Sequence, residues 1–194
     1  MRKLFGGMVL AALVLSVTTA AHAQRRPATS ASMGGAKHEL GVDLAAAYVD
    51  PGTAGVDGGI TIISPVDVRF GIVPRAGSKL MWEPRMAFSF SSVGGNTVYA
   101  LTPTLRGLYS NSPGGHRRGM YFAGGAGLVL GDPGIGSGTA FKLEAGVGWR
   151  KPYGSGAWRY ELGFQWVSSN DNLAIAGLAD YIAIGGRIGI SLWH

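Results

Sequence analysis

Two runs of alternating apolar and polar residues, separated by a short turn at 151–156, occupy residues 139–168. Successive side chains of an extended strand point to opposite faces, so strict alternation over such long runs predicts two strands joined as a hairpin. One face of this hairpin is apolar and ends in aromatic residues. The other face combines glycines with charges of both signs, such as Lys142 and Glu144.

The same alternation begins at His38 and recurs in further runs along the chain. These runs lie at 40–48, 60–72, 80–90, 99–109, 120–130 and 182–192, which with the hairpin makes eight expected strands. The run at 120–130 is so rich in glycine and alanine that it leaves open which residues share a face. The connections are short enough for hairpins, and closure removes both sheet edges. The sequence therefore predicts an all-β fold, an eight-stranded antiparallel up-and-down β-barrel over residues 38–194.

Three prolines lie inside the expected strands, at Pro65, Pro84 and Pro103. Proline lacks the N–H that a strand donates to its neighbour. We therefore expect bulges or local irregularity at these positions.

The N-terminal segment is typical of export. A basic start at residues 2–3 precedes an apolar stretch at 4–17 and the small-x-small site Ala21-His22-Ala23. We predict a signal peptide at 1–23, cleaved after Ala23, because the apolar stretch is short for an anchor helix that crosses ~30 Å of hydrocarbon. Residues 24–37 are small, polar and unpatterned, which predicts a flexible periplasmic lead-in.

Composition narrows the class of protein. Only 14% of the residues are charged and 46% are hydrophobic, with 33 glycines and a mean hydropathy of +0.19. The absence of cysteine excludes disulfides and thiolate metal sites, and no His, Asp and Glu cluster has metal-ligand spacing. Neither a metal nor another cofactor is expected. The basic residues are scattered singly along the strands, which argues against a nucleic-acid partner.

The alternating faces allow two opposite arrangements. A soluble barrel would bury the apolar face, whereas a transmembrane barrel turns it to lipid and carries aromatic girdles at both interfaces. The aromatic residues fall at the ends of the apolar faces, as two girdles require. The girdle nearer the termini would contain Phe70, Trp82, Tyr109, Trp149, Trp158 and Tyr160, and the other Tyr48, Phe88, Phe90, Tyr99, Phe141 and Trp166.

In a transmembrane barrel the polar faces share a narrow lumen. Glycines make room there, and carboxylates pair with cationic groups, because a buried charge without a partner is costly. A midplane Arg or Lys turned to lipid would instead cost about 2–4 kcal/mol. The predicted lumen charge network consists of Asp43, Asp67, Arg69, Glu83, Arg85, Arg106, Lys142, Glu144, Arg159, Glu161 and Arg187.

This strand pattern, with runs such as 122–127, 143–149 and the closing 186–192, resembles the small eight-stranded outer-membrane barrels of Gram-negative bacteria, the OmpA- and OmpX-like group. The resemblance covers residues 36–194. It implies that the barrel-assembly machinery inserts the chain into the outer membrane. Barrels of this group commonly end in an aromatic residue, usually Phe, whereas this sequence ends Leu192-Trp193-His194.

The sequence shows no catalytic constellation. Some barrels of this size are lipid-modifying esterases with a His-x-Ser-Asn element, but no histidine stands two places before Ser168 or Ser169. A serine nucleophile needs a base within hydrogen-bond reach, and none of the four histidines lies in the interior of an expected strand. The glycine-rich segment 131–138 lacks the lysine and the helix of a phosphate loop.

We therefore predict a non-enzymatic outer-membrane β-barrel with a salt-bridged, largely plugged lumen. Its role would be structural, or a surface interaction through loops at 50–58, 92–96, 131–138 and 169–180. A porin-like barrel that transports small molecules is the alternative, followed by a lipid-modifying enzyme and a soluble periplasmic barrel. The expected partners are outer-membrane lipid, lipopolysaccharide and the assembly machinery, and the expected state is a monomer.

Overall fold

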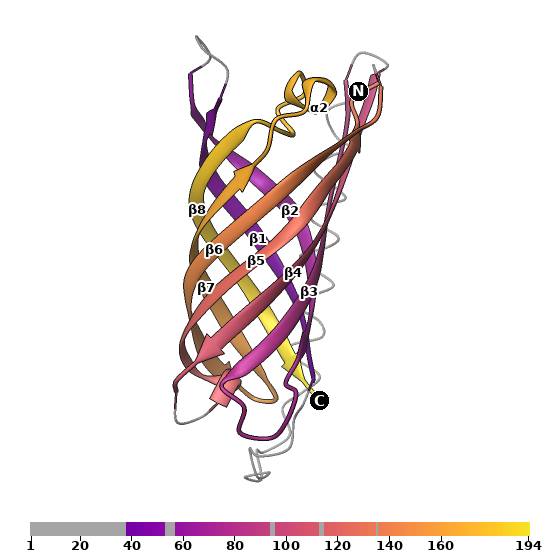
Figure 1. The fold of residues 1–194 in the computed structure, drawn as a ribbon. Helices are drawn as coiled ribbons and strands as arrows, with labels where there is room; N and C mark the ends of the chain where they lie inside the picture. Colours follow the sequence, from indigo (N-terminus) through magenta and orange to yellow (C-terminus); the bar gives the residue numbers. More distant parts are fainter. Residues whose placement is uncertain (1–37, 53–56, 94–95, 113–114, 135) are drawn as a thin grey trace, which may run out of the picture. The chain divides into compact units, whose positions relative to one another are not determined.

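The computed structural model describes residues 38–52, 57–93, 96–112, 115–134 and 136–194. Over these residues, eight antiparallel strands pair in chain order and the first pairs with the last, which closes a barrel (Figure 1). The predicted fold class is therefore confirmed. The predicted signal peptide and lead-in, at 1–23 and 24–37, lie outside the described residues.

The strands agree closely with the alternating runs of the sequence. They are β1 (His38–Pro51), β2 (Gly59–Ile72), β3 (Leu80–Val93), β4 (Asn96–Ser110), β5 (Gly119–Asp132), β6 (Gly138–Tyr153), β7 (Gly156–Val167) and β8 (Tyr181–Trp193). A 3-10 turn, η1 (Gly115–Arg117), connects β4 to β5, and a short helix, α2 (Asp171–Ala174), lies between β7 and β8. No helix among the described residues is long and apolar enough to cross a membrane.

The barrel has two distinct ends. At the terminal end, β1 begins beside the end of β8, and the N–H of His38 donates to the carbonyl of His194. The β2–β3, β4–β5 and β6–β7 connections lie at this same end. The other four connections, including α2, form the loop end, which is opposite the C-terminus in Figure 1.

The apolar faces of the strands point outward. Leu143 and Leu162 are 43% and 60% exposed, whereas the adjacent Lys142 and Glu161 are only 7% and 4% exposed. Burial alternates in the same way along β1, whose buried positions are occupied by charged or small residues. An outward apolar face is the arrangement expected of a barrel in the hydrocarbon core of a membrane. It is the reverse of the arrangement in a soluble barrel.

The strand prolines interrupt pairing locally, as expected. The β1–β2 register shifts between Asp43 and Ala46, next to Pro65. Pairing with β2 lapses opposite Pro84, and pairing with β5 lapses at Pro103, whereas the β3–β4 ladder is continuous through both. A residue in an antiparallel strand directs its N–H toward one neighbour only. Each of these two prolines therefore interrupts one ladder and leaves the other intact.

Candidate functional site

The barrel interior is the part of the molecule in which polar groups converge. Two clusters of buried apolar residues lie toward its ends. The cluster at the terminal end contains Val73, Met81, Leu108, Tyr121, Ala123 and Trp193. The cluster at the loop end contains Ala100, Val129, Ala140, Val167, Leu173 and Ala179, with Leu178 and Tyr181 packed against it.

Charged side chains fill the space between these clusters, and we call them the interior network. It consists of the carboxylates Glu39, Asp43, Asp67, Glu83, Glu144 and Glu161 and the cations Arg69, Arg85, Arg106, Lys142, Arg150, Arg159 and Arg187. They come from seven of the eight strands. Every member of the interior network takes part in at least one ion pair.

Glu83 is surrounded by cations. Both of its oxygens accept hydrogen bonds from the guanidinium of Arg159. Four further arginines lie within ion-pair distance, at 3.7 Å for Arg106, 3.8 Å for Arg69, 3.9 Å for Arg150 and 4.0 Å for Arg85. Removing a charge from water is costly unless opposite charges and hydrogen bonds replace the solvent. Here five guanidinium groups take that role around one carboxylate.

A second part of the interior network lies toward the loop end. Glu144 pairs with Lys142 at 2.8 Å, with Arg187 at 3.1 Å and with Arg106 at 3.2 Å. Arg187 also donates to Glu161 at 2.9 Å. The pairs made by Arg106 and Arg187 join different strands, so the network ties the walls of the barrel together across its interior.

Tyr121 connects ion pairs at the terminal-end side of the network. Its hydroxyl donates to Glu161 at 2.8 Å and accepts from Nε of Arg159 at 2.6 Å. Its ring lies against the guanidinium groups of Arg150 and Arg159, 4.9 and 5.0 Å from the ring centroid. A Cβ on Gly148 would overlap this ring, so the missing side chain provides the space for the phenol.

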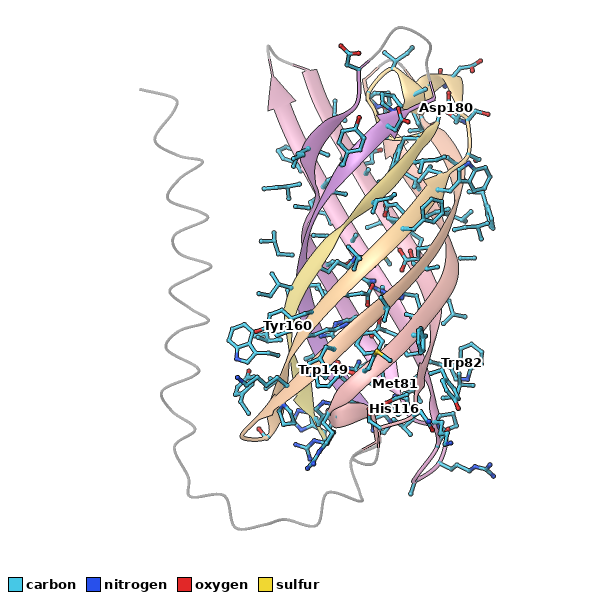
Figure 2. The ribbon with its side chains drawn as sticks, turned by 90° about the vertical axis from the view of Figure 1, so that its left-hand side faces the viewer. Met81, Trp82, His116, Trp149, Tyr160 and Asp180 are labelled. Atoms are coloured by element: carbon cyan, nitrogen blue, oxygen red, sulfur yellow. The ribbon has the colours of Figure 1, made fainter. Side chains whose placement is uncertain are left out.

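The structure places all eleven residues of the predicted lumen charge network inside the barrel, with side chains no more than 10% exposed. It brings them together in one connected set of ion pairs. The twelve aromatic residues assigned to girdles all have exposed side chains on the outer face. Trp82, Trp149 and Tyr160 lie at the terminal end, and Asp180 marks the opposite end (Figure 2).

Sequence reasoning missed several interior groups. Glu39 and Arg150 are fully enclosed and pair with each other at 2.8 Å. Each lies an even number of residues from a predicted member on its own strand and therefore points to the same face. This spacing could have identified both. Tyr121 lies in the glycine- and alanine-rich run at 120–130, where the sequence does not show which residues share a face. Its inward position follows from the pairing of β5 with β6, which sets it opposite Gly148.

His116 is a buried histidine in η1, on the terminal-end side of the interior network. Its Nε2 lies 3.0 Å from the carbonyl of Ser78, and its own carbonyl accepts a hydrogen bond of 2.7 Å from Arg150. No described residue is a hydrogen-bond partner of its Nδ1. Burial, and next the positive charge of Arg150, lower the pKa of His116 below its usual value.

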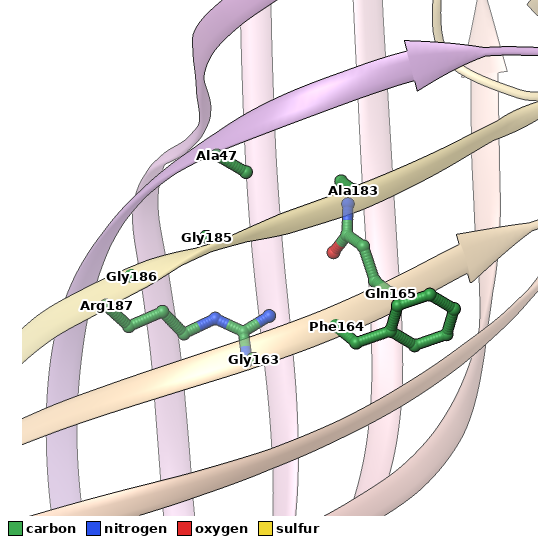
Figure 3. Close-up of a pocket in the computed structure, with 8 residues that line it drawn as sticks. All are labelled: Ala47, Gly163, Phe164, Gln165, Ala183, Gly185, Gly186 and Arg187. Carbon is green, nitrogen blue, oxygen red and sulfur yellow. The ribbon is translucent and has the colours of Figure 1, made fainter.

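Little space is left between the side chains near the loop-end cluster. A cavity of about 10 Å³ is lined by residues of β1, β7 and β8, among them Ala47, Gln165 and Arg187 (Figure 3). This is room for about one water molecule. Among the described residues, no group of His, Asp and Glu is arranged to hold a metal ion. The hydroxyl of Ser168, one of the two serines weighed above as an esterase nucleophile, accepts a hydrogen bond from the N–H of Phe141.

Comparison with solved structures identifies the architecture. Neisserial surface protein A (NspA) superimposes with a TM-score of 0.51 at 12% sequence identity, over 82% of this chain and 99% of that protein. This chain has the small eight-stranded outer-membrane barrel fold. Ail, the attachment invasion locus protein of Yersinia pestis, matches with a TM-score of 0.46 at 9% identity, over 81% of this chain and 97% of Ail. No family model and no curated protein matches the sequence.

Proposed function

We propose that this protein is a non-enzymatic outer-membrane β-barrel with a closed lumen, which holds a structured loop surface at the membrane. The observation that carries the proposal is the filling of the barrel by the interior network between two apolar clusters. An ion crossing the barrel would have to displace paired charges and then apolar side chains. Neither the interior network nor the apolar clusters contain a hydrated path for an ion.

The loop end supports a surface role because three of its connections are linked by hydrogen bonds. The N–H of Gly52 donates to the carbonyl of Asp180 at 2.7 Å, which links the β1–β2 and β7–β8 connections. Asn170 and Asn172 donate to the carbonyls of Thr139 and Ser137, which links α2 to the start of β6. A surface that is ordered in this way presents a fixed arrangement of groups, which lowers the entropy cost of binding.

The test of the closed lumen is conductance. The mature protein should be refolded, inserted into a planar bilayer and held at a steady voltage. Insertion is checked in the same preparation by the shift in gel mobility between heated and unheated samples. We expect a folded, inserted barrel without steady current above that of the bare bilayer. A stable ohmic current would instead support porin-like transport and reject the closed lumen.

A further inference from the structure

The charges outside the interior network are sorted between the two ends of the barrel. The connections at the terminal end carry the basic residues Arg75, Lys79, Arg117 and Arg118, and their sequences contain no Asp or Glu; a fifth basic residue, Lys151, lies near the end of β6 at the same end of the barrel. The connections at the loop end, with the strand residues that border them, carry the acidic residues Asp50, Asp57, Asp132, Asp171 and Asp180 and no Lys or Arg. The barrel is thus basic at one end and acidic at the other.

These five basic residues, which we call the basic rim, come from the β2–β3 connection, the β4–β5 connection and the end of β6. Arg75 and Lys79 are exposed in the β2–β3 connection, and Arg118 is exposed between η1 and β5. Arg117 donates to the carbonyl of Ser155 at 3.0 Å, which links the β4–β5 and β6–β7 connections. The charges are therefore spread around the circumference of the barrel.

The basic rim borders the outward aromatic residues of the terminal end. Lys151 is exposed two residues after Trp149 on the same face of β6, and it pairs in register with Trp158 of β7. Lys79 directly precedes β3, whose outward face begins with Leu80 and Trp82. Tryptophan favours the membrane–water interface, and a flexible lysine side chain extends from that depth to the headgroups.

We propose that the basic rim binds the anionic headgroups of phospholipids in the leaflet at the terminal end of the barrel. The inference rests on the proposed outer-membrane location. Cations arranged around a ring, next to apolar and aromatic side chains, face the headgroup layer from several directions at once. Each Lys or Arg close to an anionic surface strengthens the association by roughly five-fold. The acidic loop end has the opposite charge, so it does not share this preference.

The test measures lipid selectivity. The protein is refolded into vesicles of phosphatidylcholine that contain a fixed fraction of phosphatidylglycerol. The motionally restricted fraction of spin-labelled phosphatidylglycerol is compared with that of spin-labelled phosphatidylcholine. We expect several-fold selectivity for phosphatidylglycerol, which weakens as salt is added because exposed charges are screened.

Two sets of variants locate the effect. Arg75→Gln, Lys79→Gln and Lys151→Gln together should abolish most of the selectivity, and Arg118→Gln should reduce it independently. The matched control, Asp50→Asn with Asp57→Asn, removes charge at the loop end and should leave the selectivity unchanged. Heat-modifiable mobility shows that each variant is folded.

The outcomes separate the two proposals. If the wild type inserts but restricts both lipids equally, or if the triple variant retains full selectivity, the basic rim does not bind anionic headgroups and the closed barrel stands. If the wild type fails to insert into these vesicles, the outer-membrane function itself is rejected, and this inference with it.

Discussion

At the scale of single residues, the stability of the barrel depends on keeping buried charges in balance. Glu83 is fully buried and lies within ion-pair distance of five arginines. Glu83→Gln keeps the shape of the side chain and removes its charge. Breaking a buried ion pair from one side costs about 3–5 kcal/mol, and we expect a loss of this size in the free energy of unfolding by urea in micelles. A loss below about 1 kcal/mol would show that water compensates the arginines.

Close packing around Tyr121 leads to a second prediction at this scale. Gly148→Ala places a Cβ in the volume of the phenol ring, and overpacking of this kind costs about 1–3 kcal/mol. The cost should disappear when Tyr121 is also replaced by Ala, because the overlapping ring is then gone. Gly124→Ala is the control, since the nearest atom to its added Cβ is an ordinary contact at 3.9 Å. Equal losses from the two single glycine variants would contradict this explanation.

His116 should make stability depend on pH. Burial lowers its pKa in the folded state below the usual value of about 6.5. Below that pH the unfolded chain binds a proton that the folded chain does not, so the free energy of unfolding decreases as the pH falls. Arg150 opposes the added charge, and Glu39, which also faces the site, only partly offsets it.

The measurement is urea unfolding of the wild type and of His116→Gln between about pH 8 and pH 5. We expect the wild type to lose more stability than the variant over this range. The amide of the variant can still donate to the carbonyl of Ser78, which makes it a suitable control. Parallel curves for the two proteins would exclude His116 as the titrating group.

At the scale of the elements, period-two alternation was sufficient to predict eight strands and the outward apolar face. It failed where neighbouring side chains do not differ in polarity. In β5, which is rich in Gly and Ala, it did not show that Tyr121 points inward. It also could not predict α2, because four residues are too few for a helical period. The partners within the interior network were not predictable either. They depend on the stagger of strands around the closed barrel, which brings Glu83 of β3 to Arg159 of β7.

The connection between β7 and β8 is an apolar cap on the loop end. Leu173 in α2 is completely buried, and Leu173→Ala should cost about 2–5 kcal/mol of unfolding free energy through the cavity it leaves. Ile175 in the same connection is 75% exposed, so Ile175→Ala is the matched control and should change stability by less than about 0.5 kcal/mol. Leu173→Ala should not create conductance, because the interior network beneath the cap is unchanged. A steady current from this variant alone would show that the cap is the only barrier.

At the scale of the whole molecule, charges occupy two kinds of environment, and salt distinguishes them. The interior network is enclosed by the barrel wall and by two apolar clusters, whereas four of the five residues of the basic rim are exposed. Dissolved ions screen exposed charges over a Debye length of about 3 Å at 1 M salt, but they act weakly on charges they cannot approach. Barrel stability and lipid selectivity should therefore respond differently to salt.

We expect the free energy of unfolding in uncharged micelles to change by less than about 1 kcal/mol between about 0.05 and 1 M NaCl, while the selectivity for phosphatidylglycerol falls over the same range. Uncharged detergent removes the contribution of headgroups from the stability measurement. A steep loss of stability with salt would mean that ions reach Glu83, Glu144 and their arginine partners. Ions that reach these groups have entered the lumen, so such a result would argue against the closed barrel from stability data alone, without any measurement of current.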